Sequence, residues 1–117
     1  MNTPVYDFLI QYAERDPVRL HMPGHKGRFG APALQRATAL DLTEITGADS
    51  LFEAEGILAE SERNAASLYG TAYTFYSCGG STLCIQTMLL LMKQQGRAVL
   101  AARNVHRAFL NTCVLLD

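Results

Sequence analysis

The chain has 117 residues, of which 49% are hydrophobic and 18% are charged, and its formal net charge is −1. This length and composition are typical of one globular domain and exclude a disordered or collagen-like chain. The apolar runs are too short to span a bilayer, and ten basic residues against eleven acidic ones argue against a nucleic-acid partner. The N-terminus lacks a secretory pattern and the three cysteines are an odd number, so we expect a cytoplasmic protein with a small-molecule partner.

The first half of the chain alternates predicted helices with an irregular loop. Residues 3–15 place apolar side chains at helical spacing, with Thr3 as a possible N-cap. Residues 19–30 contain three glycines and a proline, which indicate an exposed but ordered loop. Residues 32–40 could form one or two helical turns, whereas residues 41–55 show no clear period.

The second half of the chain predicts a strand, a helix and a second strand in succession, which is a βαβ unit. Aromatic and β-branched residues at 72–77 indicate a buried strand, and the apolar run 98–102 indicates another. Helices are predicted over 56–69, 81–95 and about 105–116, the last with Asn104 as its N-cap. Because two parallel strands would leave edges unpaired, we expect the polypeptide to continue well beyond Asp117.

The turn Cys78-Gly79-Gly80-Ser81-Thr82, between the first predicted strand and the following helix, is the strongest candidate for a binding site. Free N–H groups at a helix start, two glycines and two adjacent hydroxyls together favour a phosphate. The alternative is a tight turn in which Ser81 only caps the helix. The spacing fits neither a Walker loop nor a nucleophile elbow nor a dinucleotide fingerprint.

The three histidines are the other candidates. His21 and His25 are four residues apart, but Pro23-Gly24 between them breaks any helix, so we expect no metal site. His106 follows the second predicted strand and would lie at the same sheet edge as the glycine turn, where it could converge with Ser81 and Thr82. The alternative is a surface histidine at a helix start.

Four segments follow one another along the chain: RLHMPGHKGR, DLTEITGADSLFEAEGILAESE, YSCGGSTLCIQTMLLLM and AARNVHRAF. In this order they resemble the start of the large domain of the Orn/Lys/Arg decarboxylases, which are pyridoxal-phosphate enzymes. The resemblance implies an α/β fold, here an incomplete fragment of the fold-type I large domain with a mostly parallel sheet and helices on both faces. It also implies an N-terminal helix and PGHK loop segment over residues 1–55, the first part of the cofactor domain over 56–117, and a homodimer or higher oligomer.

The resemblance further implies roles for four residues. Gly80, Ser81 and Thr82 would bind the phosphate of pyridoxal phosphate, and His106 would stack on its ring as a catalytic residue. The function implied is a lyase that decarboxylates arginine, lysine or ornithine in polyamine biosynthesis. Neither Lys26 nor Lys93 matches the family's Schiff-base lysine, so we expect the 117 residues alone to be inactive. The competing hypothesis is a free-standing small α/β module that binds a phosphate ligand or a partner without catalysis.

Overall fold

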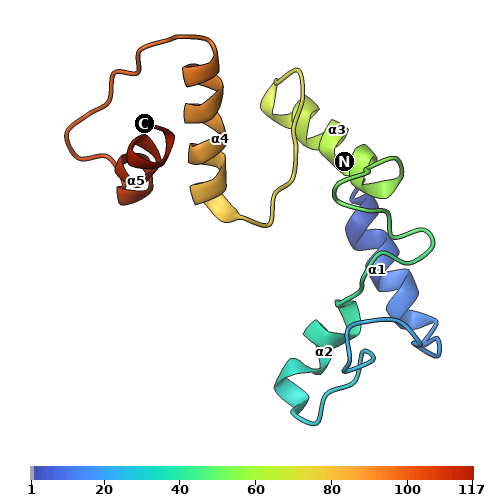
Figure 1. Cartoon of the computed structure of the whole chain (residues 1–117). Helices are drawn as coiled ribbons and strands as arrows, with labels where there is room; N and C mark the ends of the chain where they lie inside the picture. Colours follow the sequence, from blue (N-terminus) through green and yellow to red (C-terminus); the bar gives the residue numbers. More distant parts are fainter. Residues whose placement is uncertain (1) are drawn as a thin grey trace. The chain divides into compact units, whose positions relative to one another are not determined.

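The structure, a computed structural model, describes residues 2–117, and its described part consists of helices joined by irregular segments (Figure 1). The helices are α1 (Pro4–Glu14), α2 (Pro32–Leu40), α3 (Ile57–Tyr69), α4 (Gly80–Gln94) and α5 (Arg107–Leu116). The chain divides into two compact units, Met1–Tyr76 with α1 to α3 and Ser77–Asp117 with α4 and α5. The functional division at residue 56 that the sequence suggested stays a prediction.

The helices lie where the sequence pattern predicts them. α1 begins at Pro4, whose fixed φ suits the first helical position, and the Asp7 carboxylate accepts hydrogen bonds from the Thr3 N–H and hydroxyl at 3.2 and 3.0 Å. α3 ends at Gly70, which takes the left-handed conformation (φ 65°) that favours glycine. Local signals of this kind were sufficient to predict the helices.

The predicted α/β fold is wrong, because the part of the chain that the structure describes contains no strand. No backbone hydrogen bond joins residues 72–77 or 98–102 to an extended partner in these described residues. The apolar side chains that suggested burial are instead exposed: Tyr73 by 79%, Phe75 by 80% and Leu100 completely. A strand exists only through its pairing, so β-forming composition alone did not produce one.

A buried arginine organises the loop between α1 and α2. Arg19 is only 8% exposed, and its guanidinium donates to the carbonyls of Ala39 at 2.6 Å, Asp41 at 3.4 Å and Thr38 at 3.5 Å. It also lies 5.1 Å from the centre of the Tyr12 ring in α1. Arg19 therefore joins α1 to the C-terminal end of α2, where the last carbonyls of a helix lack partners within the helix.

An aspartate of the loop before α3 satisfies the start of that helix. The Asp49 carboxylate accepts backbone hydrogen bonds from Ser50, Glu55, Gly56 and Leu58 at 2.8 to 3.1 Å. Desolvation raises the pKa of Asp49, but the four N–H donors lower it by more, and the pKa falls from 3.8 to about 2. The ionised carboxylate thus accepts the first N–H groups of α3, as an N-cap side chain would, although Asp49 lies outside the helix.

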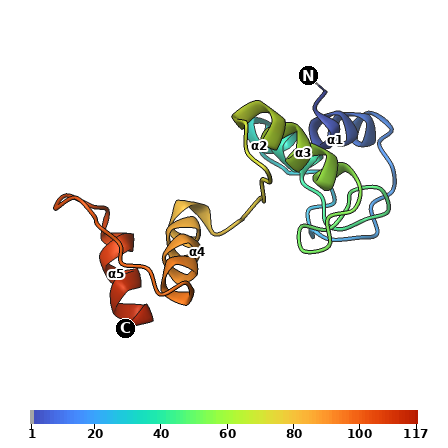
Figure 2. The same cartoon turned by 90° about the horizontal axis from the view of Figure 1, so that it is seen from above.

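The second unit is a pair of helices with few buried side chains. Leu89 of α4 and Ala108 and Thr112 of α5 are its buried residues, with 5%, 7% and 1% exposed. The Lys93 ammonium, near the end of α4, donates to the carbonyls of Leu116 and Asp117 at the end of α5. The helices therefore run in the same direction, and their N-termini lie at the same end of the unit (Figures 1 and 2).

We expect Arg19→Met to destabilise the protein by roughly 1.5 to 3 kcal/mol, because the carbonyls at the end of α2 lose a charged donor. Urea unfolding followed by far-UV circular dichroism measures this change. Arg28→Met is the matched control, since Arg28 makes only an exposed ion pair with Asp16 at 3.0 Å, and it should cost at most about 1 kcal/mol. Equal losses in the two variants would contradict the role of Arg19.

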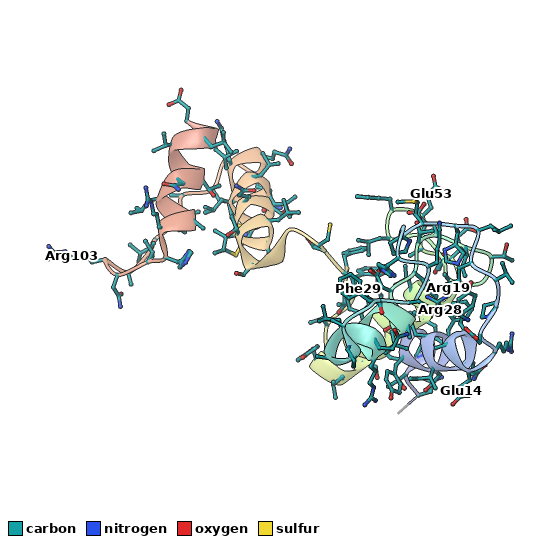
Figure 3. All side chains as sticks on the ribbon, turned by 90° about the horizontal axis from the view of Figure 1, so that it is seen from below. Glu14, Arg19, Arg28, Phe29, Glu53 and Arg103 are labelled. Atoms are coloured by element: carbon teal, nitrogen blue, oxygen red, sulfur yellow. The ribbon has the colours of Figure 1, made fainter. Side chains whose placement is uncertain are left out.

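Asp49 gives the first unit a predictable response to acid. Because its pKa is lower in the folded state, the stability that it contributes is present above about pH 4 and is lost as the pH falls toward 2. We expect Asp49→Asn to be less stable than the parent at about pH 7, with a difference that shrinks at about pH 3, in the same unfolding measurement. Glu53→Gln, an exposed carboxylate of the same loop (Figure 3), should behave like the parent at both pH values. A constant difference between Asp49→Asn and the parent would refute the prediction.

Candidate functional site

The glycine turn lies directly at the start of α4. Gly80 has φ 62°, a left-handed conformation that would strain any other residue. Gly79 precedes it in close contact with Leu83, since a Cβ on Gly79 would lie 2.6 Å from the Leu83 Cβ. The Ser77 hydroxyl accepts the Gly79 N–H at 3.1 Å and so holds the entry to the turn. The backbone conformation therefore favours glycine at position 80, and the contact with the Leu83 side chain favours it at position 79.

The same turn leaves a set of hydrogen-bond donors without partners. In the described chain no acceptor pairs with the N–H groups of Gly80, Ser81 or Thr82, and α4 has no side-chain cap. The Ser81 and Thr82 side chains are exposed. The predicted alternative, in which Ser81 caps the helix, is therefore not what the structure shows. Backbone amides, two hydroxyls and the positive end of the helix dipole form a donor set that suits a phosphate.

His106 occupies the N-cap of α5, a position that the sequence assigned to Asn104. Its backbone is extended (φ −62°, ψ 145°), and its Nδ1 accepts the Ala108 N–H at 3.2 Å. The preceding loop carries Arg103, whose side chain points away from both helices (Figure 3). The helix therefore starts two residues later than predicted, and the imidazole rather than an amide satisfies its first turn.

The candidate site residues lie at the starts of the two helices of the second unit. Gly80, Ser81 and Thr82 open α4 and His106 opens α5, and both helix starts lie at the same end (Figure 2). Convergence of these residues at a sheet edge stays a prediction, because the described chain contains no sheet and shows only that the two helices start at the same end of this unit. The start of α4 thus has unpaired backbone donors, whereas the start of α5 is capped by an imidazole.

The other two histidines have structural roles in the PGHK loop. The His25 Nδ1 accepts the Gly27 N–H at 3.1 Å, and its Nε2 lies 3.1 Å from the Asp41 carboxylate, to which it donates. The His21 Nδ1 donates to the Met22 carbonyl at 2.5 Å, and its Nε2 lies 2.7 Å from the Tyr12 hydroxyl. Among the described residues no group of three or more His, Cys, Asp or Glu side chains could hold a metal ion.

Two residues that organise the first unit are not evident from the sequence pattern. Arg19 gave no signal, because a basic residue in a glycine-rich loop is usually solvated. Asp49 gave a weak signal, because it is an aspartate seven residues before Gly56 in a segment that is rich in acidic residues but has no helical period. Its positive φ (69°) and its distant amide partners could not be predicted from sequence.

A protein-family comparison identifies the chain independently. The model for the Orn/Lys/Arg decarboxylase major domain matches residues 3–117. The chain therefore belongs to this family, as its motifs predicted. No solved structure gives a significant match.

Curated relatives include an arginine decarboxylase of Bacillus subtilis, 33% identical over 118 residues, which cover 96% of this chain and 24% of that protein. An arginine decarboxylase of Bacillus cereus is 31% identical over 118 residues, covering 96% of this chain and 26% of that protein. A lysine decarboxylase of Pseudomonas aeruginosa is 24% identical over 127 aligned positions, which cover 96% of this chain and 16% of that protein. The chain thus spans about a quarter of the length of the arginine decarboxylases that it matches.

None of the helices in residues 2–117 has the length and apolar character needed to cross a membrane. The three cysteines, Cys78, Cys84 and Cys113, are exposed free thiols.

Proposed function

We propose that this chain is the N-terminal part of a pyridoxal-phosphate-dependent decarboxylase of a basic amino acid. The observation that carries the proposal is the family match over residues 3–117. Arginine is the first substrate to test, because the arginine decarboxylases match at 31 to 33% identity and the lysine decarboxylase at 24%. Ornithine is the third candidate. A cytoplasmic location and a homodimer or higher oligomer belong to the same proposal.

In this proposal the start of α4 binds the cofactor phosphate. The unpaired N–H groups of Gly80, Ser81 and Thr82 and the two hydroxyls supply donors to the phosphate oxygens, and the helix dipole favours their charge. His106 limits the tilt of the cofactor ring by stacking on it. When bound, the cofactor supplies the electron sink that loss of a carboxylate requires.

The 117 residues alone lack part of this machinery. Lys26 and Lys93 are the lysines of the chain. Lys26 donates to the His21 carbonyl at 2.6 Å inside the PGHK loop, and Lys93 binds the end of α5. Both ammonium groups thus have structural partners, which supports the expectation that the covalent attachment of the cofactor needs a lysine from elsewhere.

The decisive experiment measures the intact mass of the polypeptide purified from its native source, together with its release of CO₂ from arginine, lysine and ornithine. We expect a mass several-fold above 12.8 kDa and CO₂ release from one of the three. A mass of 12.8 kDa without CO₂ release would overturn the proposal and favour a binding module without catalysis. A larger protein inert toward all three amino acids would also contradict it.

We expect the double substitution Ser81→Ala with Thr82→Ala to weaken cofactor binding in the native polypeptide. Loss of charge-assisted hydrogen bonds to a phosphate costs about 1.5 to 3 kcal/mol, which is roughly a ten- to hundredfold rise in Kd. Titration with pyridoxal phosphate, followed by its absorbance, measures the change. Thr87→Ala, an exposed threonine in the middle of α4, is the matched control and should leave the Kd unchanged. An unaltered Kd in the double variant would remove the phosphate site from α4.

A further inference from the structure

His25 lies in a tight turn whose hydrogen bonds require a neutral imidazole. The Arg28 N–H closes the turn by donating to the His25 carbonyl at 2.9 Å. The Gly27 N–H donates to the His25 Nδ1 at 3.1 Å, and Gly27 is buried, with no other acceptor for this N–H among the described residues. A backbone N–H can only donate, so Nδ1 must present a lone pair. The ring proton is therefore on Nε2, which lies 3.1 Å from the Asp41 carboxylate.

The same turn lies against the buried arginine that joins α1 to α2. Gly27 has φ 75°, and a Cβ on this residue would clash with the Arg19 guanidinium, so the backbone and the guanidinium are in close contact. Arg19 also donates to the Asp41 carbonyl at 3.4 Å, while the Asp41 side chain accepts from His25. These four residues therefore form a closed cycle of contacts, and a change at the imidazole affects how the loop is held against the end of α2.

Several charged or titratable groups belong to the segments that meet at this turn. They are Asp41 after α2, Arg19 after α1, and on the loop itself His21, Lys26 and Arg28, the last paired with Asp16. Asp41 is the one carboxylate among the described residues that contacts the imidazole. Its side chain is 58% exposed, and an exposed ion pair contributes little to stability, so Asp41 compensates only weakly for a positive charge on the ring.

We propose that His25 makes the conformation of the PGHK loop (residues 23–26) depend on pH: the neutral imidazole closes the turn, and protonation opens it. A protonated imidazole carries an N–H on both nitrogens, so Nδ1 would face the Gly27 N–H as a second donor. The buried N–H then loses its acceptor, which costs more than the exposed ion pair with Asp41 returns. Because imidazoles titrate between about pH 5 and 8, a small change in acidity is sufficient.

Hydrogen exchange of the Gly27 amide in the native polypeptide tests the proposal. Its rate relative to an unstructured peptide at the same pH gives a protection factor, which mass spectrometry with fragmentation assigns to the residue. We expect this factor to be roughly tenfold lower at about pH 5 than at about pH 8. The amides within α3 are the internal control, since Asp49, which binds the start of that helix, has a pKa of about 2 and stays ionised at both pH values. An unchanged factor at Gly27, or an equal fall in α3, would overturn the proposal.

Two substitutions at position 25 separate the acceptor from its proton. In His25→Asn the amide oxygen accepts the N–H two residues further on, as asparagine does in turns, and it does not titrate. In His25→Phe the acceptor is lost. We expect the protection factor of Gly27 to be high at both pH values in the first variant and low at both in the second. His21→Asn is the matched control and should keep the pH dependence, because the His21 ring contacts Tyr12 rather than Gly27. A pH dependence that survives in His25→Asn would assign the response to another group and overturn the proposal.

Discussion

The first N–H groups and the last carbonyls of an α-helix have no partner within the helix, and most of this structure depends on how they are satisfied. The buried apolar residues of the described chain are few, namely Ala66, Leu89 and Ala108, and two of the three are alanines. Such contacts alone provide little burial energy to fix the position of a helix. Side chains from outside a helix therefore contribute much of its placement: Arg19 binds the end of α2, and Asp49 binds the start of α3. Both join segments that are distant in the sequence.

The helices were predictable from the sequence because their signals are local. Apolar spacing, Pro4 at the first position of α1 and Gly70 after α3 act within a few residues, and the structure places helix boundaries close to those positions. The strands were not predictable in the same way. The stacked and exposed rings of Tyr73 and Phe75, 6.4 Å apart, show that an aromatic, β-branched segment stays unpaired where the described chain offers it no neighbour.

The candidate site was predictable in its residues but not in its geometry. Gly80 was recognised because a glycine turn before a helix is a local pattern, and its left-handed φ agrees with that pattern. The cap of α5 was assigned to Asn104 because asparagine is the better N-cap by preference. The structure starts the helix two residues later, so that a histidine takes this position. Preferences rank residue types, whereas the structure starts α5 at Arg107 and buries Ala108 and Thr112 of that helix.

A comparison of the five helix starts supports the proposal that α4 binds a phosphate. α1 and α2 begin with a proline, which has no N–H to satisfy. The first amides of α3 are bound by the Asp49 carboxylate, and that of Ala108 in α5 by His106. Only α4, among the helices of residues 2–117, has neither a proline nor a side-chain cap at its start. Its first three amides, those of Gly80, Ser81 and Thr82, therefore have no partner within the described residues, whereas Asp49 and His106 occupy amides at the starts of α3 and α5, and this difference supports the phosphate site proposed at the glycine turn.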